Sequence, residues 1–305
     1  MYRSEIPAAK HIVGRECCLR EYEKDPPDRT APHGEWILDI ASYYAPDSSF
    51  YTYLAAKEQQ RDDEENSVRI SQMAFARAVT AAIEDGIDLL NVSAGRSTPN
   101  CTHGECTYCS EARRAIRNGI TVIAAAGNHP DDVVHCPSNA LPAVSVGGVE
   151  IECTYSMPRI PNNPTGNPPQ AYWTRLWSGY EDYPESAADG IYCTTRDCWV
   201  DSGDCTQYME PTVWDRNPIP SGEKPDILSP LHYAREDENG YPFVWAASSF
   251  AAPVVTGCLS GTLSTLDTVI SPPEIRSAVR EGATHLDSAP ANIFDSAEAR
   301  RLLQK

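Results

Sequence analysis

Residues 246–257 read Ala-Ala-Ser-Ser-Phe-Ala-Ala-Pro-Val-Val-Thr-Gly, with small residues around two serines and an apolar run directly after them. Pro253 falls where the first turn of a helix still accepts proline, because the missing N–H would have no partner there. We therefore expect a helix that begins at the serines. Unpaired N–H groups and the helix dipole favour negative charge at such a start, so an oxyanion at Ser249 would be stabilised. Taken alone, the segment is more simply an N-cap serine before a buried helix.

The composition excludes several classes of function. The chain has 305 residues, which suits one large α/β domain or two smaller ones. Its net charge of −18 argues against nucleic-acid binding through a positive field. No apolar run is long enough to span a membrane, and the first residues lack the apolar core of a signal peptide. We expect an acidic, cytoplasmic monomer, or a secreted protein if the N-terminus is incomplete.

Helix-like and strand-like patterns alternate along the chain. Apolar residues at helical spacing predict helices at 33–44, 67–83, 111–118, 272–281 and 297–303. Short apolar runs predict strands at 50–55, 87–93, 120–126 and 143–149. This alternation predicts an α/β fold, a doubly wound and mainly parallel sheet with helices on both faces. In such a sheet the site lies at the carboxyl ends of the strands, where Ser93-Ala94-Gly95 and Ala126-Gly127-Asn128 stand.

Residues 150–222 depart from this pattern. They are rich in Pro, Asn, Tyr, Trp and Gly, include four cysteines and show little periodicity. We interpret them as a long, irregular, cysteine-rich insertion within a single domain of residues 1–305. Lys224-Pro225-Asp226 marks the return to the core.

Four blocks, taken in order, resemble the subtilisin-like serine peptidases (the subtilase family, peptidase family S8). They are His33-Gly34, Ser93-Ala94-Gly95, Ala125 to Asn128, and the serine block 246–257. The likeness covers roughly residues 30 to 300, apart from the insertion, and implies a subtilisin-like three-layer fold. The serine block departs from the family's Gly-Thr-Ser, because Ala247-Ser248 stands in place of Gly-Thr. The alanine adds a methyl group close to the serine and narrows the site.

The resemblance implies a hydrolase, a serine endopeptidase that acts on polypeptides through an acyl-enzyme. Ser249 would attack the scissile carbonyl, and His33 would take its proton and later deliver it to the leaving amine. The side-chain amide of Asn128 and the backbone N–H of Ser249 would stabilise the oxyanion. The walls that bind the substrate backbone would be formed by Ser93, Ala94, Gly95, Ala125, Ala126 and Gly127.

The aspartate of the family's triad is not found. The family places it at the end of a strand some tens of residues before the histidine, where this chain offers only Glu5. Three interpretations stay open: the first strand is missing, Glu5 replaces the acid, or the protein is an impaired relative that binds peptides or a partner. Without the acid, serine and histidine would retain activity about 10⁴-fold lower.

The cysteines allow two further interpretations. Their number, 11, is odd, so intramolecular disulfides leave at least one unpaired. The densest group of possible metal ligands comprises Cys101, His103, Cys106 and Cys109. We expect disulfides or free thiols here, and no bound cofactor. The alternative is a structural zinc site, with Cys136 or His135 as a distant ligand. A second group comprises Cys193, Cys198 and Cys205.

Overall fold

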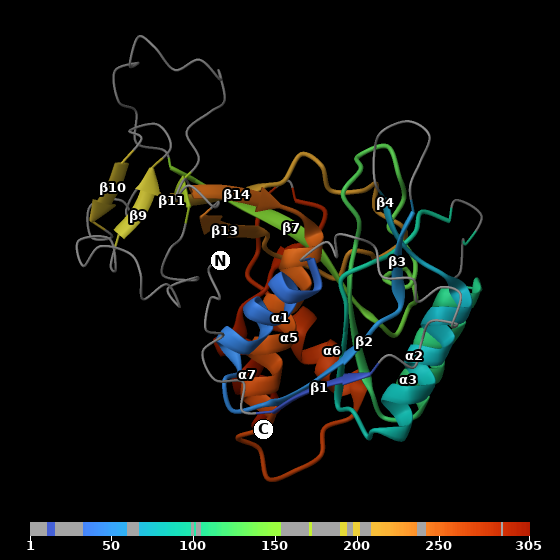
Figure 1. Ribbon diagram of the computed structural model, residues 1–305. Coiled ribbons are helices and arrows are strands. Elements are labelled where there is room, and N and C mark those ends of the chain that lie inside the picture. Colours follow the sequence, from blue (N-terminus) through green and yellow to red (C-terminus); the bar gives the residue numbers. More distant parts are fainter. Residues whose placement is uncertain are drawn as a thin grey trace.

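The computed structural model describes 11–15, 33–59, 67–98, 101, 105–153, 171–172, 190–193, 198–201, 209–236, 242–287 and 289–305. The helices are α1 (His33–Tyr44), α2 (Gln72–Glu84), α3 (Thr107–Arg117), α5 (Ser248–Leu263), α6 (Pro272–Glu281) and α7 (Ser296–Leu303). They form two layers with the main sheet between them: α2 and α3 on one side, and the other four on the opposite side (Figure 1). The three-layer α/β architecture predicted from the alternating pattern is confirmed.

Among the described residues, six strands form the main sheet. They are β5 (Leu89–Val92), β6 (Thr121–Ala125), β7 (Val144–Cys153), β11 (Met209–Val213), β12 (Ile227–Pro230) and β15 (Asn292–Ile293). Five run parallel in the order β15-β12-β7-β6-β5, and β11 pairs antiparallel with β7. The carboxyl ends of β5 and β6 therefore lie side by side, as the alternation requires.

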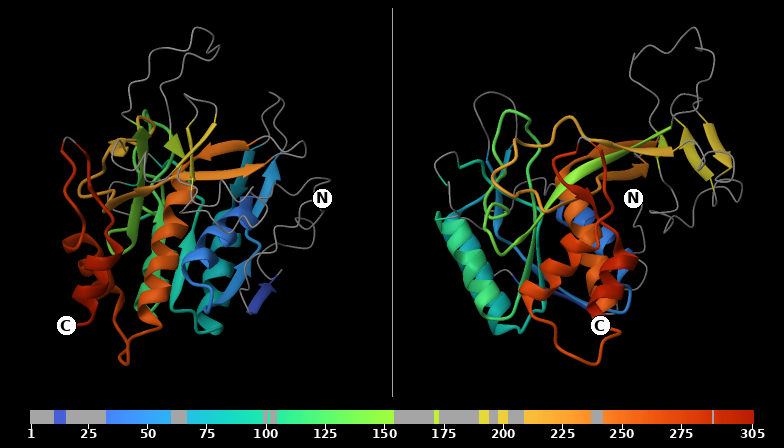
Figure 2. Two further views of the ribbon diagram at one scale, coloured as in Figure 1. Left: turned by 90° about the vertical axis from the view of Figure 1, so that its left-hand side faces the viewer. Right: turned by 180° about the vertical axis from the view of Figure 1, so that it is seen from behind.

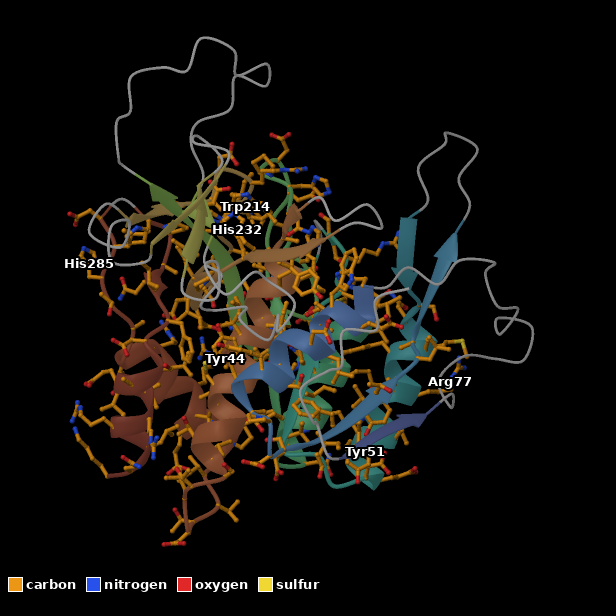
Figure 3. The ribbon with its side chains drawn as sticks, turned by 60° about the vertical axis from the view of Figure 1, so that its left-hand side comes forward. Tyr44, Tyr51, Arg77, Trp214, His232 and His285 are labelled. Carbon is orange, nitrogen blue, oxygen red and sulfur yellow. The ribbon has the colours of Figure 1, made fainter. Side chains whose placement is uncertain are left out.

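Shorter strands form separate sheets. β1 (His11–Arg15) pairs in parallel with β2 (Ser49–Tyr53), and β3 (Ala56–Gln59) pairs antiparallel with β4 (Ser67–Ile70). β8 (Ala171–Tyr172), β9 (Gly190–Cys193) and β10 (Cys198–Asp201) form a three-stranded sheet. β13 (His232–Glu236) pairs antiparallel with β14 (Pro242–Ala246). Within the main core, buried Trp214 follows β11, and Figure 3 shows it with His232 on the side of the molecule that carries β11 and β13.

Strand β6 shows why its sequence reads as a continuous apolar run. All its residues are buried, and alternate side chains enter opposite halves of the core. Val122 and Ala124 pack in the half that contains α2 and α3, whereas Ile123 and Ala125 pack in the half that contains α5 and α6. Both faces of the strand are thus covered, as expected for the centre of a doubly wound sheet.

Helices α1 and α5 approach each other closely, and this contact sets the level of the site. A Cβ atom on Gly257 would lie 2.6 Å from the carbonyl oxygen of Ala41, and one on Gly261 would lie 3.0 Å from that of Tyr44. Only glycine allows two backbones to come so near. Because Gly257 meets Ala41 and Gly261 meets Tyr44 further along both helices, α1 and α5 run in the same direction. They lie beside each other in both views of Figure 2. This alignment brings the first turn of α1 level with the first turn of α5.

Three predicted boundaries were wrong. Residues 67–70, assigned to a helix, form β4, and α2 begins only after Ser71, whose side chain accepts the Ala74 N–H at 3.1 Å. Helix α3 begins at Thr107 rather than Glu111, so part of the predicted cysteine loop is helical. The main sheet includes residues 150–153, at the start of the segment 150–222 that was expected to be irregular, and residues 209–213, in its last part.

Candidate active site

The two serines of the serine block stand at the start of α5. Ala247 is the N-cap in extended conformation, and Ser248 is the first helical residue. The N–H of Ser249 thus belongs to the first turn, where an α-helix supplies no acceptor of its own. The expected junction of serine and helix start is present, and the helix dipole points its positive end at Ser249.

Pro253 lies inside α5 rather than in its first turn, so its expected position was wrong. A proline at this position removes the N–H that would bond to the carbonyl of Ser249. The hydroxyl of Ser93 donates to that carbonyl oxygen instead, at 2.7 Å. The missing helical hydrogen bond is therefore replaced by one from a side chain that follows β5, which ties the backbone of Ser249 to the sheet.

A chain of hydrogen bonds continues from Ser93 along α5. The side-chain amide nitrogen of Asn91 donates to the Ser93 hydroxyl at 2.8 Å, and the Thr256 hydroxyl donates to the Asn91 amide oxygen at 3.0 Å. Ser93 was predicted to lie in the substrate wall, whereas no role was predicted for Asn91 or Thr256. The apolar run predicted that Asn91 lies on a buried strand, and a buried amide requires hydrogen-bond partners. That requirement is the signal in the sequence from which this network could have been found.

Asn128 is oriented by Ser248, the residue before the predicted nucleophile. The backbone N–H and the hydroxyl of Ser248 both lie 2.8 Å from Oδ1 of Asn128. A backbone N–H only donates, so the atom that faces it is the amide oxygen. The amide nitrogen is then the group left to donate elsewhere. The Ser248 hydroxyl also accepts the N–H of Gly127 at 3.1 Å, which joins the end of β6 to the start of α5.

His33 is the first residue of α1, as predicted, and lies at the level of the serines. Its ring centroid is 5.8 Å from that of Phe250, the neighbour of Ser249. Burial lowers the pKa of His33, because desolvation penalises the imidazolium. Within the described part of the chain, no carboxylate forms an ion pair or hydrogen bond with His33. Asp39 accepts from the Tyr233 hydroxyl at 2.8 Å, and Glu5 lies outside the described residues.

The predicted substrate walls face a common side chain, His135. A Cβ atom on Gly95 would lie 3.1 Å from His135 Cβ, and one on Gly127 would lie 2.9 Å from the His135 ring. Gly127 also has a φ of 122°, which disfavours other residues. The His135 ring therefore limits the space between the two predicted walls. Its Nε2 atom is 3.2 Å from a carboxylate oxygen of Asp132.

Two further groups of candidate residues are both rich in cysteine. The sulfur atoms of Cys101, Cys106, Cys109 and Cys136 cluster together, whereas His103 and Cys205 lie outside the described residues. The backbones of Cys193 and Cys198 are paired in the β9–β10 hairpin.

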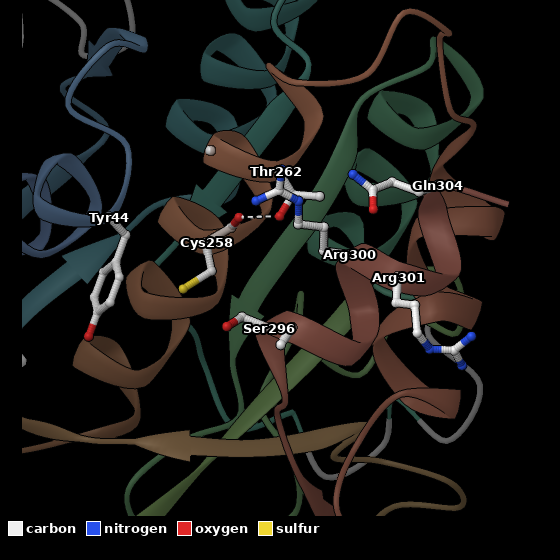
Figure 4. A pocket seen from close by; sticks show the side chains of 9 residues that line it. Tyr44, Cys258, Thr262, Ser296, Arg300, Arg301 and Gln304 are labelled. Atoms are coloured by element: carbon white, nitrogen blue, oxygen red, sulfur yellow. Dashed lines mark hydrogen bonds between the residues drawn. The ribbon is translucent and has the colours of Figure 1, made fainter.

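A pocket of about 500 Å³ is lined by Tyr44, Cys258, Gly261, Thr262, Ser296, Ala297, Arg300, Arg301 and Gln304 (Figure 4). Its residues on α5 begin at Cys258, nine positions and about 14 Å along the helix from Ser249, so it is separate from the serine site.

A comparison with models of protein families finds a match. A sequence model described as the subtilase family matches residues 44–297. A subtilisin-like protease of Arabidopsis thaliana, SBT3.6, is 26% identical over 130 residues, which are 41% of this chain and 16% of the plant protein. The chain therefore matches only about a sixth of the length of that relative.

Solved structures share the fold at low sequence identity. The prenylagaramide maturation protease PagA has a TM-score of 0.59 and 17% identity, with 98% of this chain and 95% of PagA covered. The self-cleaved protease domain of PatA has a TM-score of 0.58 and 18% identity, with 97% and 89% covered. The nisin leader peptidase NisP of Lactococcus lactis has a TM-score of 0.53 and 12% identity, with 97% and 82% covered.

Among the helices of the described residues, none has the length and apolar character needed to cross a lipid bilayer.

Proposed function

The chain belongs to the subtilase family, and on that premise we propose that it is a serine endopeptidase with Ser249, His33 and Asn128 as its catalytic residues. The observation that carries the proposal is the orientation of Asn128. Its amide oxygen is held by the N–H and the hydroxyl of Ser248, the residue before Ser249, so its amide nitrogen is left to donate elsewhere, as is the N–H of Ser249 in the first turn of α5. Two donors at one helix start suit the oxyanion of acyl transfer.

The proposed reaction proceeds in two halves. Ser249 Oγ attacks the carbonyl carbon of the peptide bond while His33 takes the hydroxyl proton, and the resulting oxyanion is bound by the two donors. The C–N bond then breaks, and His33 passes its proton to the leaving amine. Water attacks the acyl-enzyme in the second half, with His33 again as base, and releases the carboxylic acid. The Ser93 hydroxyl supports the step by holding the carbonyl of Ser249.

A second candidate function is a peptide-binding protein with impaired catalysis. It is favoured by one observation, which is that no described carboxylate pairs with His33. Burial in the absence of such a partner destabilises the imidazolium that the first half-reaction forms. The serine, the histidine and the amide would then still bind an extended peptide but turn it over slowly.

Labelling with a fluorophosphonate probe distinguishes the two functions. We expect the full chain to form one covalent adduct, located on Ser249 by mass spectrometry of its peptides, because only an activated serine attacks the probe. His33→Ala is expected to remove the labelling, since no base would then take the proton. A folded chain that does not react would favour the peptide-binding protein, and an adduct on another serine would contradict the proposed site.

The rate of labelling is expected to depend on pH through His33. The base must be neutral, and burial lowers its pKa below the ordinary value of about 6.5. His33 therefore stays neutral to lower pH, and the acid limb of the rate should have its midpoint below about 6.5. Labelling rates measured from pH 4 to 8, corrected for the stability of the chain, test this. A midpoint above 6.5 would contradict it and would point to a carboxylate beside His33.

A further inference from the structure

Four cysteine side chains from three places in the sequence meet in one cluster. They are Cys101, Cys106, Cys109 and Cys136, and all four sulfur atoms lie within 4.8 Å of one another. Cys101, Cys109 and Cys136 are buried and Cys106 is partly buried. The sulfurs of Cys101 and Cys109 are 3.9 Å apart, nearly twice the length of a disulfide bond, so this pair is not bonded.

These distances fit a single tetrahedral metal ion. Four sulfurs at about 2.3 Å from zinc in a tetrahedron stand about 3.8 Å from one another. A two-iron cluster would place sulfurs on different iron atoms farther apart than sulfurs on the same iron. A set in which every pair lies within 4.8 Å therefore matches one ion better than a cluster. Tetrahedral sites of four thiolates are typical of zinc.

The local backbone also suits thiolates. Cys106 is the N-cap of α3 and Cys109 lies in its first turn, where the helix dipole favours negative charge. The N–H of Cys106 points at the sulfur of Cys101, at 3.4 Å. We propose that Cys101, Cys106, Cys109 and Cys136 bind one structural zinc ion. His103 is not needed for the set, because Cys136 supplies the fourth sulfur.

The proposed zinc would join the two loops that follow the substrate walls. Cys101 comes soon after Gly95, and Cys136 comes soon after Asn128. The backbones of Arg96 and Cys136 already exchange two hydrogen bonds, of 3.0 and 2.9 Å. The residue before Cys136 is His135, which lies against Gly95 and Gly127. An ion bound to Cys136 would thus fix the segment that holds His135 between the walls.

Metal content of the full chain tests the proposal. The protein is purified with a reductant and without chelator, and its metals are measured by mass spectrometry and X-ray absorption. We expect one zinc bound in this cluster, with four sulfur neighbours at about 2.3 Å. Cys106→Ser, at the partly exposed position, should lower the affinity for zinc by at least about tenfold, measured by competition with a chelator. Cys258→Ser, which changes a cysteine of α5 outside the cluster, should retain the zinc.

Thiol alkylation provides a readout that needs no variant. In the native wild-type chain the four cysteines should resist alkylation until a strong chelator removes the zinc, and peptide mapping should identify these four as newly modified. Several outcomes would overturn the proposal. They are a chain without metal, iron in place of zinc, disulfides among the four, or zinc that remains in both Cys106→Ser and Cys136→Ser. None depends on peptidase activity, so the zinc site and the proposed function fail separately.

Discussion

Ser249→Ala is expected to abolish fluorophosphonate labelling and to lower kcat on peptide substrates about 100-fold. In subtilisin, removal of the serine lowers kcat about 10⁶-fold, whereas removal of the aspartate alone lowers it about 10⁴-fold. The ratio, about 10²-fold, is what the serine still contributes when the acid is missing. We expect the smaller loss here, because no described carboxylate pairs with His33. Hydrolysis of internally quenched peptides gives kcat for both forms.

Ser248→Ala is a control for the position of labelling, not for the rate, since it removes the hydroxyl of the adjacent residue, which supports Asn128. Its chain should still be labelled, on the peptide that contains Ser249. A loss of kcat near 10⁶-fold in Ser249→Ala would contradict the interpretation that the triad has no acid. It would indicate that a carboxylate outside the described residues pairs with His33. Glu5→Gln then tests the one candidate that the sequence analysis named. Unchanged hydrolysis in Ser249→Ala would contradict the serine mechanism itself.

The sequence predicted the fold well where one pattern dominated. β5 and β6 are followed by Ser93-Ala94-Gly95 and Ala126-Gly127-Asn128, and their apolar runs identified them as buried parallel strands. The first turn of α3 was missed because Cys106 to Cys109 reads as a polar cysteine loop. The strand at 67–70 was missed because its partner is not local: it pairs with 56–59, and a periodicity within 67–83 carries no information about that pairing.

The candidate site was predicted as a set of residues but not as a set of contacts. A resemblance of blocks selected His33, Asn128 and Ser249, and the structure brings their segments to the start of α5. It did not reveal that Ser248 holds Asn128 or that Ser93 compensates for Pro253. Such bonds depend on side-chain direction across segments far apart in sequence. Cys136 was predicted only as an alternative to His135 as a distant ligand, because strand-like bonds to Arg96, and not spacing, bring it to the other cysteines.

Asn128→Leu is expected to lower kcat about 10²- to 10³-fold with little change in KM. Leucine keeps the approximate volume and removes the donor, so the oxyanion loses about 3–4 kcal/mol of stabilisation in the transition state; the magnitude is that of subtilisin. Steady-state kinetics on the same peptides measure both constants. A rise in KM at unchanged kcat would contradict the role, because it would mean that Asn128 binds substrate and transition state equally.

A double-mutant cycle then tests how Asn128 is held. In the wild-type background Ser248→Ala removes one of the two hydrogen bonds to the amide oxygen, that of the hydroxyl, and keeps that of the backbone N–H. This change should lower kcat about tenfold, as the loss of one hydrogen bond to a polar group would. In the Asn128→Leu background the same change should cost nothing further, because the amide that Ser248 orients is gone. Additive losses would show that Ser248 acts by another route, and the orientation of Asn128 would then no longer support an oxyanion role.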